Sequence, residues 1–163
     1  MKNIIEQQVD AIIDGKLPSL TNISNILAIL YHELPHINWA GLYLCDTKKQ
    51  ECILGPFQGK VACTRIPYKK GVVGTCAHTK ENILVKNVHE FPGHIACDSA
   101  SQCEIVCPLQ YEDTLYAILD IDSDHLDNFS QEDYTVVLNV ATTLSKLLYK
   151  DNAWIHSAIH SLD

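Results

Sequence analysis

The clearest strand patterns of this chain are Cys103-Glu104-Ile105-Val106-Cys107-Pro108-Leu109-Gln110 and Leu115-Tyr116-Ala117-Ile118-Leu119-Asp120-Ile121-Asp122. Each is a short run rich in apolar and β-branched residues, bounded by polar or turn-forming residues. Only residues 111–114 separate the two runs, which is too short a segment for the helical crossover that parallel strands require. The spacing therefore argues against a doubly wound parallel sheet.

Helical patterns lie at both ends of the chain. One covers residues 2–14, and a second begins at a cap provided by Ser19 or Thr21 and is stopped by Pro35. Ser130, with acidic residues in the turn that follows it, predicts the start of a final helix. We expect an α+β fold in a single domain, with a central antiparallel sheet covered by N- and C-terminal helices. Its core should span about residues 18–150, with a C-terminal tail at 151–163.

The middle of the chain predicts further short elements. Strands are expected at 39–45, 52–54, 64–68 and 83–85, one or two helical turns at 72–79, and a break in the chain at 55–59, where Gly55-Pro56-Phe57-Gln58-Gly59 contains turn-forming residues.

Composition limits the classes of function. The chain has 163 residues, with 20 acidic and 12 basic side chains and a net charge of -8, which speaks against nucleic acid or an anionic membrane as the main partner. The residues after Met1 are too polar for a signal peptide, and no apolar run is long enough to span a bilayer.

The seven cysteines are odd in number and widely scattered. This pattern is typical of reduced thiols, and we expect a cytoplasmic protein.

Three carboxylates in the two strongest strands are candidates for chemistry. Strand alternation places Asp120 and Asp122 on one face, with Leu119 and Ile121 on the other. Glu104 lies on the preceding strand. Aspartate is disfavoured in strands, so the pattern is explained either by a solvated sheet face or by a functional site. Such a site could bind an ammonium group or hold a proton through a raised pKa.

A second candidate is Cys97, in the stretch Pro92-Gly93-His94-Ile95-Ala96-Cys97-Asp98. A flexible loop that leads onto a rigid strand is a common way to expose a reactive side chain. A nearby histidine or backbone donors would favour the thiolate, the nucleophilic form of cysteine. The alternative is a small, buried and inert thiol.

Metal binding is not predicted. His32-Glu33-Leu34-Pro35-His36 matches the zinc signature H-E-x-x-H, but Pro35 should end the helix that has to carry both histidines. The cysteines include no C-x-x-C pair.

Several segments match one known family. They are Ile37-Asn38-Trp39-Ala40-Gly41, Gly55-Pro56-Phe57-Gln58-Gly59-Lys60 followed by Ala62-Cys63, Gly71-Val72-Val73-Gly74-Thr75, the run from Phe91 to Ser101, and Leu119-Asp120-Ile121-Asp122-Ser123. Together they closely resemble the free methionine-(R)-sulfoxide reductases, which are stand-alone GAF-domain enzymes. The resemblance covers roughly residues 20–150. Gly93-His94-Ile95-Ala96-Cys97-Asp98 is its most specific part, because ordinary ligand-binding GAF domains do not carry this run.

The resemblance implies roles for individual residues. Cys97 matches the attacking cysteine of the family, and Cys63 matches the resolving cysteine. Trp39 and Tyr43 match the aromatic residues that wall the pocket around the thioether and methyl group. Glu104, Asp120 and Asp122 match the carboxylates that bind the amino group and assist loss of the sulfoxide oxygen.

One family position differs. The family's middle cysteine is replaced by Val73, so any relay to a further disulfide is in doubt. If residues 72–79 are helical, Cys76 would share a face with Val73 and could take over that role.

The mechanism that the resemblance implies reduces free L-methionine-(R)-sulfoxide. Cys97 attacks the sulfoxide sulfur and becomes a sulfenic acid, which Cys63 converts to a disulfide. Thioredoxin is the expected reductant, and no metal or bound cofactor is expected. The rival class is a non-catalytic GAF sensor, although a sensor has no need of two cysteines that can pair. The sequence leaves the oligomeric state open, with a homodimer as one option.

Overall fold

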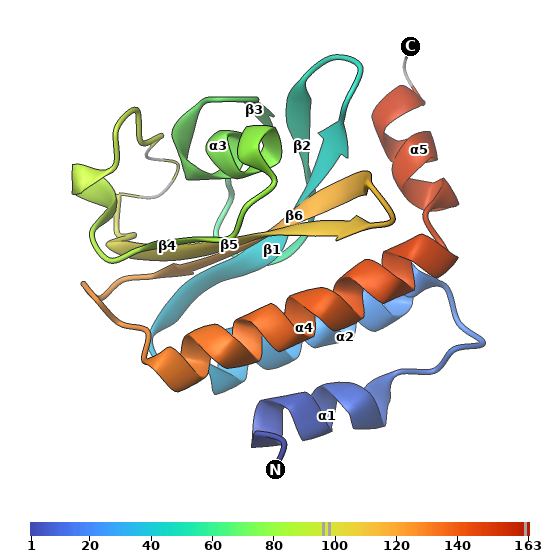
Figure 1. Ribbon diagram of the computed structural model, residues 1–163, viewed down its shortest axis with the longest axis horizontal. Helices are drawn as coiled ribbons and strands as arrows, with labels where there is room; N and C mark the ends of the chain where they lie inside the picture. The colour runs from blue at the N-terminus through green and yellow to red at the C-terminus, as the bar shows by residue number, and fades with distance from the viewer. Residues whose placement is uncertain (96, 98, 162) are drawn as a thin grey trace.

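The centre of the molecule is a curled antiparallel sheet (Figure 1). The computed structural model describes residues 1–95, 97, 99–161 and 163. Within these residues the sheet has six strands in the order β3-β2-β1-β6-β5-β4. Their bounds are β1 Ile37–Asp46, β2 Glu51–Gly59, β3 Arg65–Pro67, β4 Ile83–Val85, β5 Cys103–Tyr111 and β6 Thr114–Ser123.

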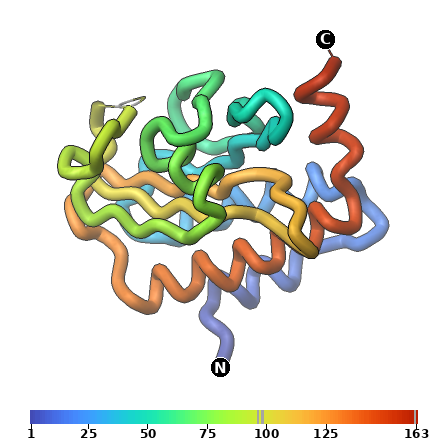
Figure 2. Tube along the Cα trace, turned by 45° about the horizontal axis from the view of Figure 1, so that its top comes forward, coloured from blue at the N-terminus to red at the C-terminus, as the bar shows by residue number. Residues whose placement is uncertain are grey.

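Helices cover the two faces of the sheet unequally. On one face lie α2 (Ser19–Glu33) and α4 (Gln131–Lys150), with α1 (Ile4–Ile12) packed beneath them (Figures 1 and 2). The other face carries α3 (Gly71–Thr79) and the irregular segments around it, including the short 3-10 helix η1 (Val88–Glu90). The expected α+β class, with an antiparallel sheet covered by N- and C-terminal helices, is confirmed. No helix in the described part of the chain is long and apolar enough to cross a membrane.

The alternation along β6 separates two cores. Leu119 and Ile121 are fully buried against α2 and α4, and each contributes about 1.5–3 kcal/mol of burial free energy. Asp120 and Asp122 belong to the opposite face, as the sequence pattern predicts. That face has a smaller core of its own, which includes Ile118. The small core leaves room for a pocket between the sheet and α3.

The expected break at residues 55–59 is wrong, because β2 continues to Gly59. Gly41 of β1 pairs with Phe57 and Tyr43 pairs with Leu54, so Gly55-Pro56 bulges opposite Leu42. A bulge tolerates proline because the missing N–H is not needed in the ladder. The strand resumes beyond it and brings Phe57 to the pocket face.

The start of α2 also differs from the expectation. Pro18 occupies the N-cap position and no side chain of the local sequence caps the helix. Instead, Asp151 Oδ2 accepts from the backbone N–H of Ser19 at 2.8 Å, and Ser19 Oγ donates to the carbonyl of Asp151 at 2.7 Å. The cap therefore comes from the far end of the chain. The segment expected as a tail contains helix α5 (Ala153–His160), whose Trp154 Nε1 donates to Ser19 Oγ.

The other helix ends follow the sequence. Helix α4 begins with a capping box, in which Ser130 Oγ accepts from the N–H of Asp133 at 3.0 Å. Helix α2 ends at Glu33, before Pro35, and His36 has a φ of 54°. His32 and His36 therefore do not share a continuous helix, and the zinc signature lacks its required geometry.

Candidate active site

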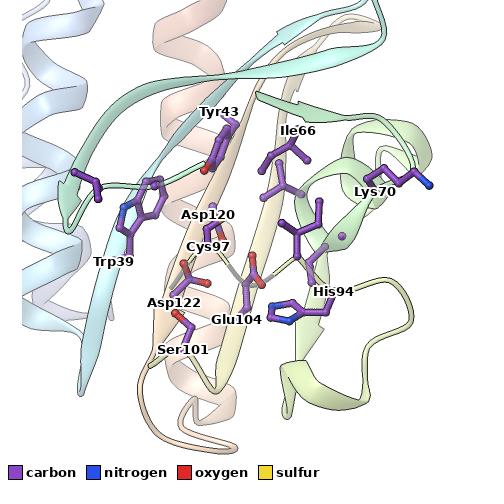
Figure 3. Close-up of a pocket in the computed structure, with 16 residues that line it drawn as sticks. Trp39, Tyr43, Ile66, Lys70, His94, Cys97, Ser101, Glu104, Asp120 and Asp122 are labelled. Carbon is purple, nitrogen blue, oxygen red and sulfur yellow. The ribbon is translucent and has the colours of Figure 1, made fainter. Parts of the chain in front are cut away.

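A pocket opens on the sheet face that carries α3. Strands β1, β5 and β6 form its floor, and the N-terminal end of α3 forms one wall (Figure 3). Its mouth is formed by Val61 and Ala62 on one side and by His94, Ile95 and Cys97 on the other. It gathers every candidate residue of the sequence except Cys63 into its lining. Those lining residues are Trp39, Tyr43, Cys97, Glu104, Asp120 and Asp122.

Cys63 is joined to this pocket through a disulfide with Cys97. The two Cα atoms are 5.5 Å apart, although 34 positions separate them in the sequence. Both residues are half-buried, so the bond lies where a thiol from solvent can approach it. The inert, buried thiol considered for Cys97 is therefore wrong. Ala96 and Asp98, two members of the motif around Cys97, lie outside the described residues.

The three carboxylates meet on neighbouring strands. Glu104 of β5 pairs in register with Asp122 of β6, and one oxygen of each of Glu104, Asp120 and Asp122 lies within 4.8 Å of the others. Glu104 is only 6% exposed and Asp120 only 5%. A solvated sheet face is therefore ruled out for these two side chains. Asp120 Oδ1 is buried without a hydrogen-bond partner, which leaves it an acceptor for a cationic ligand in the pocket.

Burial and crowding change the ionisation of this cluster. Burial, together with the charge of Asp122, raises the pKa of Glu104 to about 8. Burial also raises the pKa of Asp120 well above its usual value, and the neighbouring Glu104 adds to that effect. At neutral pH the cluster therefore retains at least one proton. A bound ammonium group or metal cation would compensate the negative charge of the carboxylates. In the described part of the chain, this is the densest set of metal-ligating side chains.

Aromatic rings line the side of the pocket formed by β1. The Trp39 ring stacks on Phe57, with centroids 5.2 Å apart, and lies 5.8 Å from the ring of Tyr43. Two glycines make room for the indole. A Cβ on Gly41 would lie 2.5 Å from Trp39 Cη2, and one on Gly59, which has a φ of 132°, would lie 2.7 Å from Trp39 Cδ1. The wall suits an apolar group such as a thioether methyl.

The same aromatic residues hold the loop that carries Cys63. Trp39 Nε1 donates to the carbonyl of Lys60 at 3.1 Å, and Tyr43 Oη donates to the carbonyl of Cys63 at 2.9 Å. The pocket wall and the cysteine loop are therefore one hydrogen-bonded unit. Sequence reasoning missed this coupling. The available signal was the alternation Trp39, Gly41, Tyr43, which places two hydrogen-bonding aromatics on one face around a residue without a side chain.

Two further residues complete the pocket near Cys97. His94 lines it beside Glu104 in Figure 3, and burial, with a smaller contribution from His89, lowers the pKa of His94. Ser101 lines its lower end and accepts a hydrogen bond from Asn38 Nδ2 at 3.1 Å. That bond ties the segment after Cys97 to the start of β1.

Known proteins resemble this chain over most of its length. The free methionine-R-sulfoxide reductase of Escherichia coli is 40% identical over 144 residues, which is 88% of this chain and 86% of that protein. The free methionine-R-sulfoxide reductase of Neisseria meningitidis, solved in complex with its substrate, has 32% identity and a TM-score of 0.84, covering 94% and 95% of the two chains. The chain belongs to the free methionine-R-sulfoxide reductase family.

A second solved structure names the fold. A putative GAF sensor protein from Burkholderia vietnamiensis has 39% identity and a TM-score of 0.83, covering 90% and 92% of the two chains. The GAF fold expected from the sequence is thereby confirmed. No protein-family model matches the chain.

Val73 stands at the position where the resemblance implies a middle cysteine. It lies in α3 and lines the pocket. Cys76 lies one turn later in the same helix, as expected, but it is fully buried. Burial raises the pKa of the Cys76 thiol, with a smaller contribution from Cys107, which disfavours the reactive thiolate. The geometry gives Cys76 no access comparable to that of Cys63.

Proposed function

We propose that this chain reduces free L-methionine-(R)-sulfoxide to L-methionine through a thiol mechanism. The observation that carries the proposal is that a disulfide cysteine and three carboxylates line the same pocket. Membership of the free methionine-R-sulfoxide reductase family supports the same reaction and the same substrate. A sensor would have no use for the paired cysteines.

In the first step, the reduced Cys97 thiolate attacks the sulfoxide sulfur. A carboxyl group protonates the sulfoxide oxygen. The resulting hydroxyl passes from the methionine sulfur to the Cys97 sulfur as the S–O bond of the sulfoxide breaks, so methionine departs and Cys97 becomes a sulfenic acid. We assign the proton to Asp122, with Glu104 beside it. Glu104 is suited to assist because its raised pKa keeps it protonated at neutral pH.

In the second step, the Cys63 thiol attacks the Cys97 sulfenic acid. The disulfide forms and the oxygen leaves as water. The hydrogen bond from Tyr43 to the Cys63 carbonyl holds the loop that carries Cys63 at the pocket. The Cys63 sulfur is therefore kept close to the Cys97 sulfur that it attacks. An external dithiol then reopens the disulfide, and we propose a thioredoxin-type protein for that task.

Selection of the free amino acid follows from the acidic cluster. The α-ammonium would lie among Glu104, Asp120 and Asp122, while the methyl and thioether groups contact Trp39 and Tyr43. A methionine sulfoxide within a peptide offers a neutral amide in place of the ammonium and adds bulk on both sides. The buried carboxylates would then lose solvent without gaining a counter-charge.

The proposed reaction is tested by following NADPH consumption with thioredoxin and thioredoxin reductase. Free methionine-(R)-sulfoxide is expected to support turnover, and the (S) epimer is not. Release of methionine is measured in parallel, so that reduction of the protein alone is not mistaken for turnover. Consumption that does not depend on the sulfoxide would contradict the proposal.

The oxidised protein is expected to contain one catalytic disulfide, between Cys63 and Cys97. After one equivalent of substrate is added to the reduced protein, digestion without reduction and mass spectrometry should recover the linked pair of peptides. Cys76 should be recovered as a free thiol, because it is buried away from the pocket mouth. Recovery of a Cys76–Cys97 peptide would show instead that the resolving role has moved to α3.

The substitution Glu104→Gln is expected to stabilise the fold at alkaline pH while it weakens substrate binding. The pKa of Glu104 is about 8 in the folded protein against 4.5 for an exposed carboxyl. At a pH between these two pKa values, Glu104 is ionised in the unfolded chain but still protonated in the folded protein. The free energy of unfolding therefore falls as pH rises through this range. Glutamine has no proton to lose, and its advantage should reach roughly 2–4 kcal/mol near pH 8 and fade toward pH 5.

This prediction is measured by urea unfolding of both proteins at pH 5 and pH 8, with the disulfide intact in each. Equal pH dependence of the two proteins would show that the Glu104 carboxyl ionises normally in the folded state.

A further inference from the structure

A basic segment lies beside the disulfide of this acidic protein. Residues 60–70 contain four cations, namely Lys60, Arg65, Lys69 and Lys70, and no acidic residue, although the whole chain has a net charge of -8. Arg65 forms an ion pair with Glu51, with 2.6 Å between Nη1 and Oε1. Within the described residues, the three lysines form no ion pair. Lys70 extends away from the pocket in Figure 3, so its charge faces the surroundings.

Exposed apolar side chains accompany these charges at the pocket mouth. Val61, two residues before Cys63, is 88% exposed, which is the largest value for a large hydrophobic side chain of the described residues after Met1. Ile95, two residues before Cys97, is 36% exposed. Both line the same pocket as Cys97. Each half of the disulfide is therefore preceded by an exposed apolar side chain.

We propose that Lys60, Val61, Lys70 and Ile95, here called the disulfide rim, form the docking surface for the protein that reduces the Cys63–Cys97 bond. The partner is a dithiol protein whose reactive thiol lies in apolar surface flanked by carboxylates. The inference rests on the proposed function, because that function requires the bond to be reopened in each cycle.

The chemistry requires close approach at this surface. A thiolate of the partner attacks one sulfur of the Cys63–Cys97 bond, forms a mixed disulfide and releases the other sulfur as a thiolate. The partner's second thiol then attacks the mixed disulfide, so the partner leaves oxidised and both cysteines are reduced. The Trp39 and Tyr43 hydrogen bonds hold the loop that carries Lys60, Val61 and Cys63, so these two residues of the rim stay beside Cys63. Apolar contact at Val61 and Ile95 supplies affinity, and the lysines increase the association rate.

The test compares a protein reductant with a small one. Lys60→Glu and Val61→Glu are made singly, and the rate of disulfide reduction in the oxidised protein is measured with thioredoxin and with dithiothreitol. Each variant is expected to slow reduction by thioredoxin about tenfold, an effect equal to about 1.4 kcal/mol. Dithiothreitol needs no docking surface, so its rate should stay within about twofold. Salt should slow the thioredoxin reaction of the unaltered protein more than that of Lys60→Glu.

Matched controls come from another exposed lysine–apolar pair, Lys16-Leu17, in the loop between α1 and α2. Lys16→Glu and Leu17→Glu should leave both rates unchanged. Equal losses with thioredoxin and dithiothreitol, an unchanged thioredoxin rate in the rim variants, or an equal loss in the controls would overturn the docking surface. Because these rates are measured without sulfoxide, a failure of the proposed reaction would be seen separately, as absent methionine release with dithiothreitol.

Discussion

Cys97→Ser is expected to abolish turnover of methionine sulfoxide, with a loss of at least about a thousandfold. A serine hydroxyl remains protonated at neutral pH and can form neither a sulfenic acid nor a disulfide, so no step of the cycle survives. The measurement is sulfoxide-dependent NADPH consumption with thioredoxin and its reductase. Cys103→Ser is the matched control, because Cys103 lies in the core on the opposite face of the sheet. Steady turnover by Cys97→Ser would show that Cys97 is not the nucleophile.

Cys63→Ser separates the two chemical steps. Attack by Cys97 precedes the resolving step, so this variant should release about one methionine per chain and then stop. The stalled protein should carry a sulfenic acid at Cys97, detectable by mass spectrometry after trapping with a sulfenic-acid reagent. Continued turnover at the original rate would mean that another thiol resolves the intermediate.

Much of the fold follows from local patterns. Alternation in β6 requires only the two-residue period of a strand, and it correctly placed Asp120 and Asp122 opposite Leu119 and Ile121. The capping box at Ser130 is equally local. These features depend on residues close in sequence, where spacing alone fixes the geometry.

The remainder depends on contacts between distant residues. Gly55-Pro56 has the local character of a chain break, and only pairing with β1 turns it into a bulge. The cap of α2 comes from Asp151, 132 positions away from Ser19. The hydrogen bond from Tyr43 to Cys63 likewise requires β1 and the loop after β2 to be placed together. No period in the sequence encodes such contacts.

The carboxylate cluster was predictable in one respect and not in another. Its membership could be predicted from alternation and from family resemblance, but its burial could not. Glu104 and Asp120 are nearly fully buried, in a pocket that residues of α3 and of the surrounding loops also line. That burial raises their pKa values and makes a cationic ligand favourable.

Replacing single carboxyl groups of this cluster with amides is expected to weaken substrate binding about tenfold to a hundredfold. One contact between a carboxylate and an ammonium group contributes on the order of 1.5–3 kcal/mol, which corresponds to that loss of affinity. Asp120→Asn and Glu104→Gln should therefore raise KM more than they lower kcat. Asp122→Asn should lower kcat itself, because Asp122 is assigned the proton for the sulfoxide oxygen. Glu112→Gln, in the turn between β5 and β6, is the control and should alter neither constant.

Removing the charge from the substrate should reproduce these binding defects in the unaltered protein. N-acetylmethionine-(R)-sulfoxide keeps the sulfoxide and the carboxylate but lacks the ammonium, so its kcat/KM should fall by at least about a hundredfold, since all the ammonium contacts are lost together. Asp120→Asn should reduce kcat/KM less for this compound than for the free amino acid. The acetylated substrate has no ammonium group, so residue 120 loses no contact with a cation when its carboxylate is replaced. Equal reduction of the acetylated and free substrates would contradict the assignment, and the three carboxylates would then need an explanation other than recognition of the amino group.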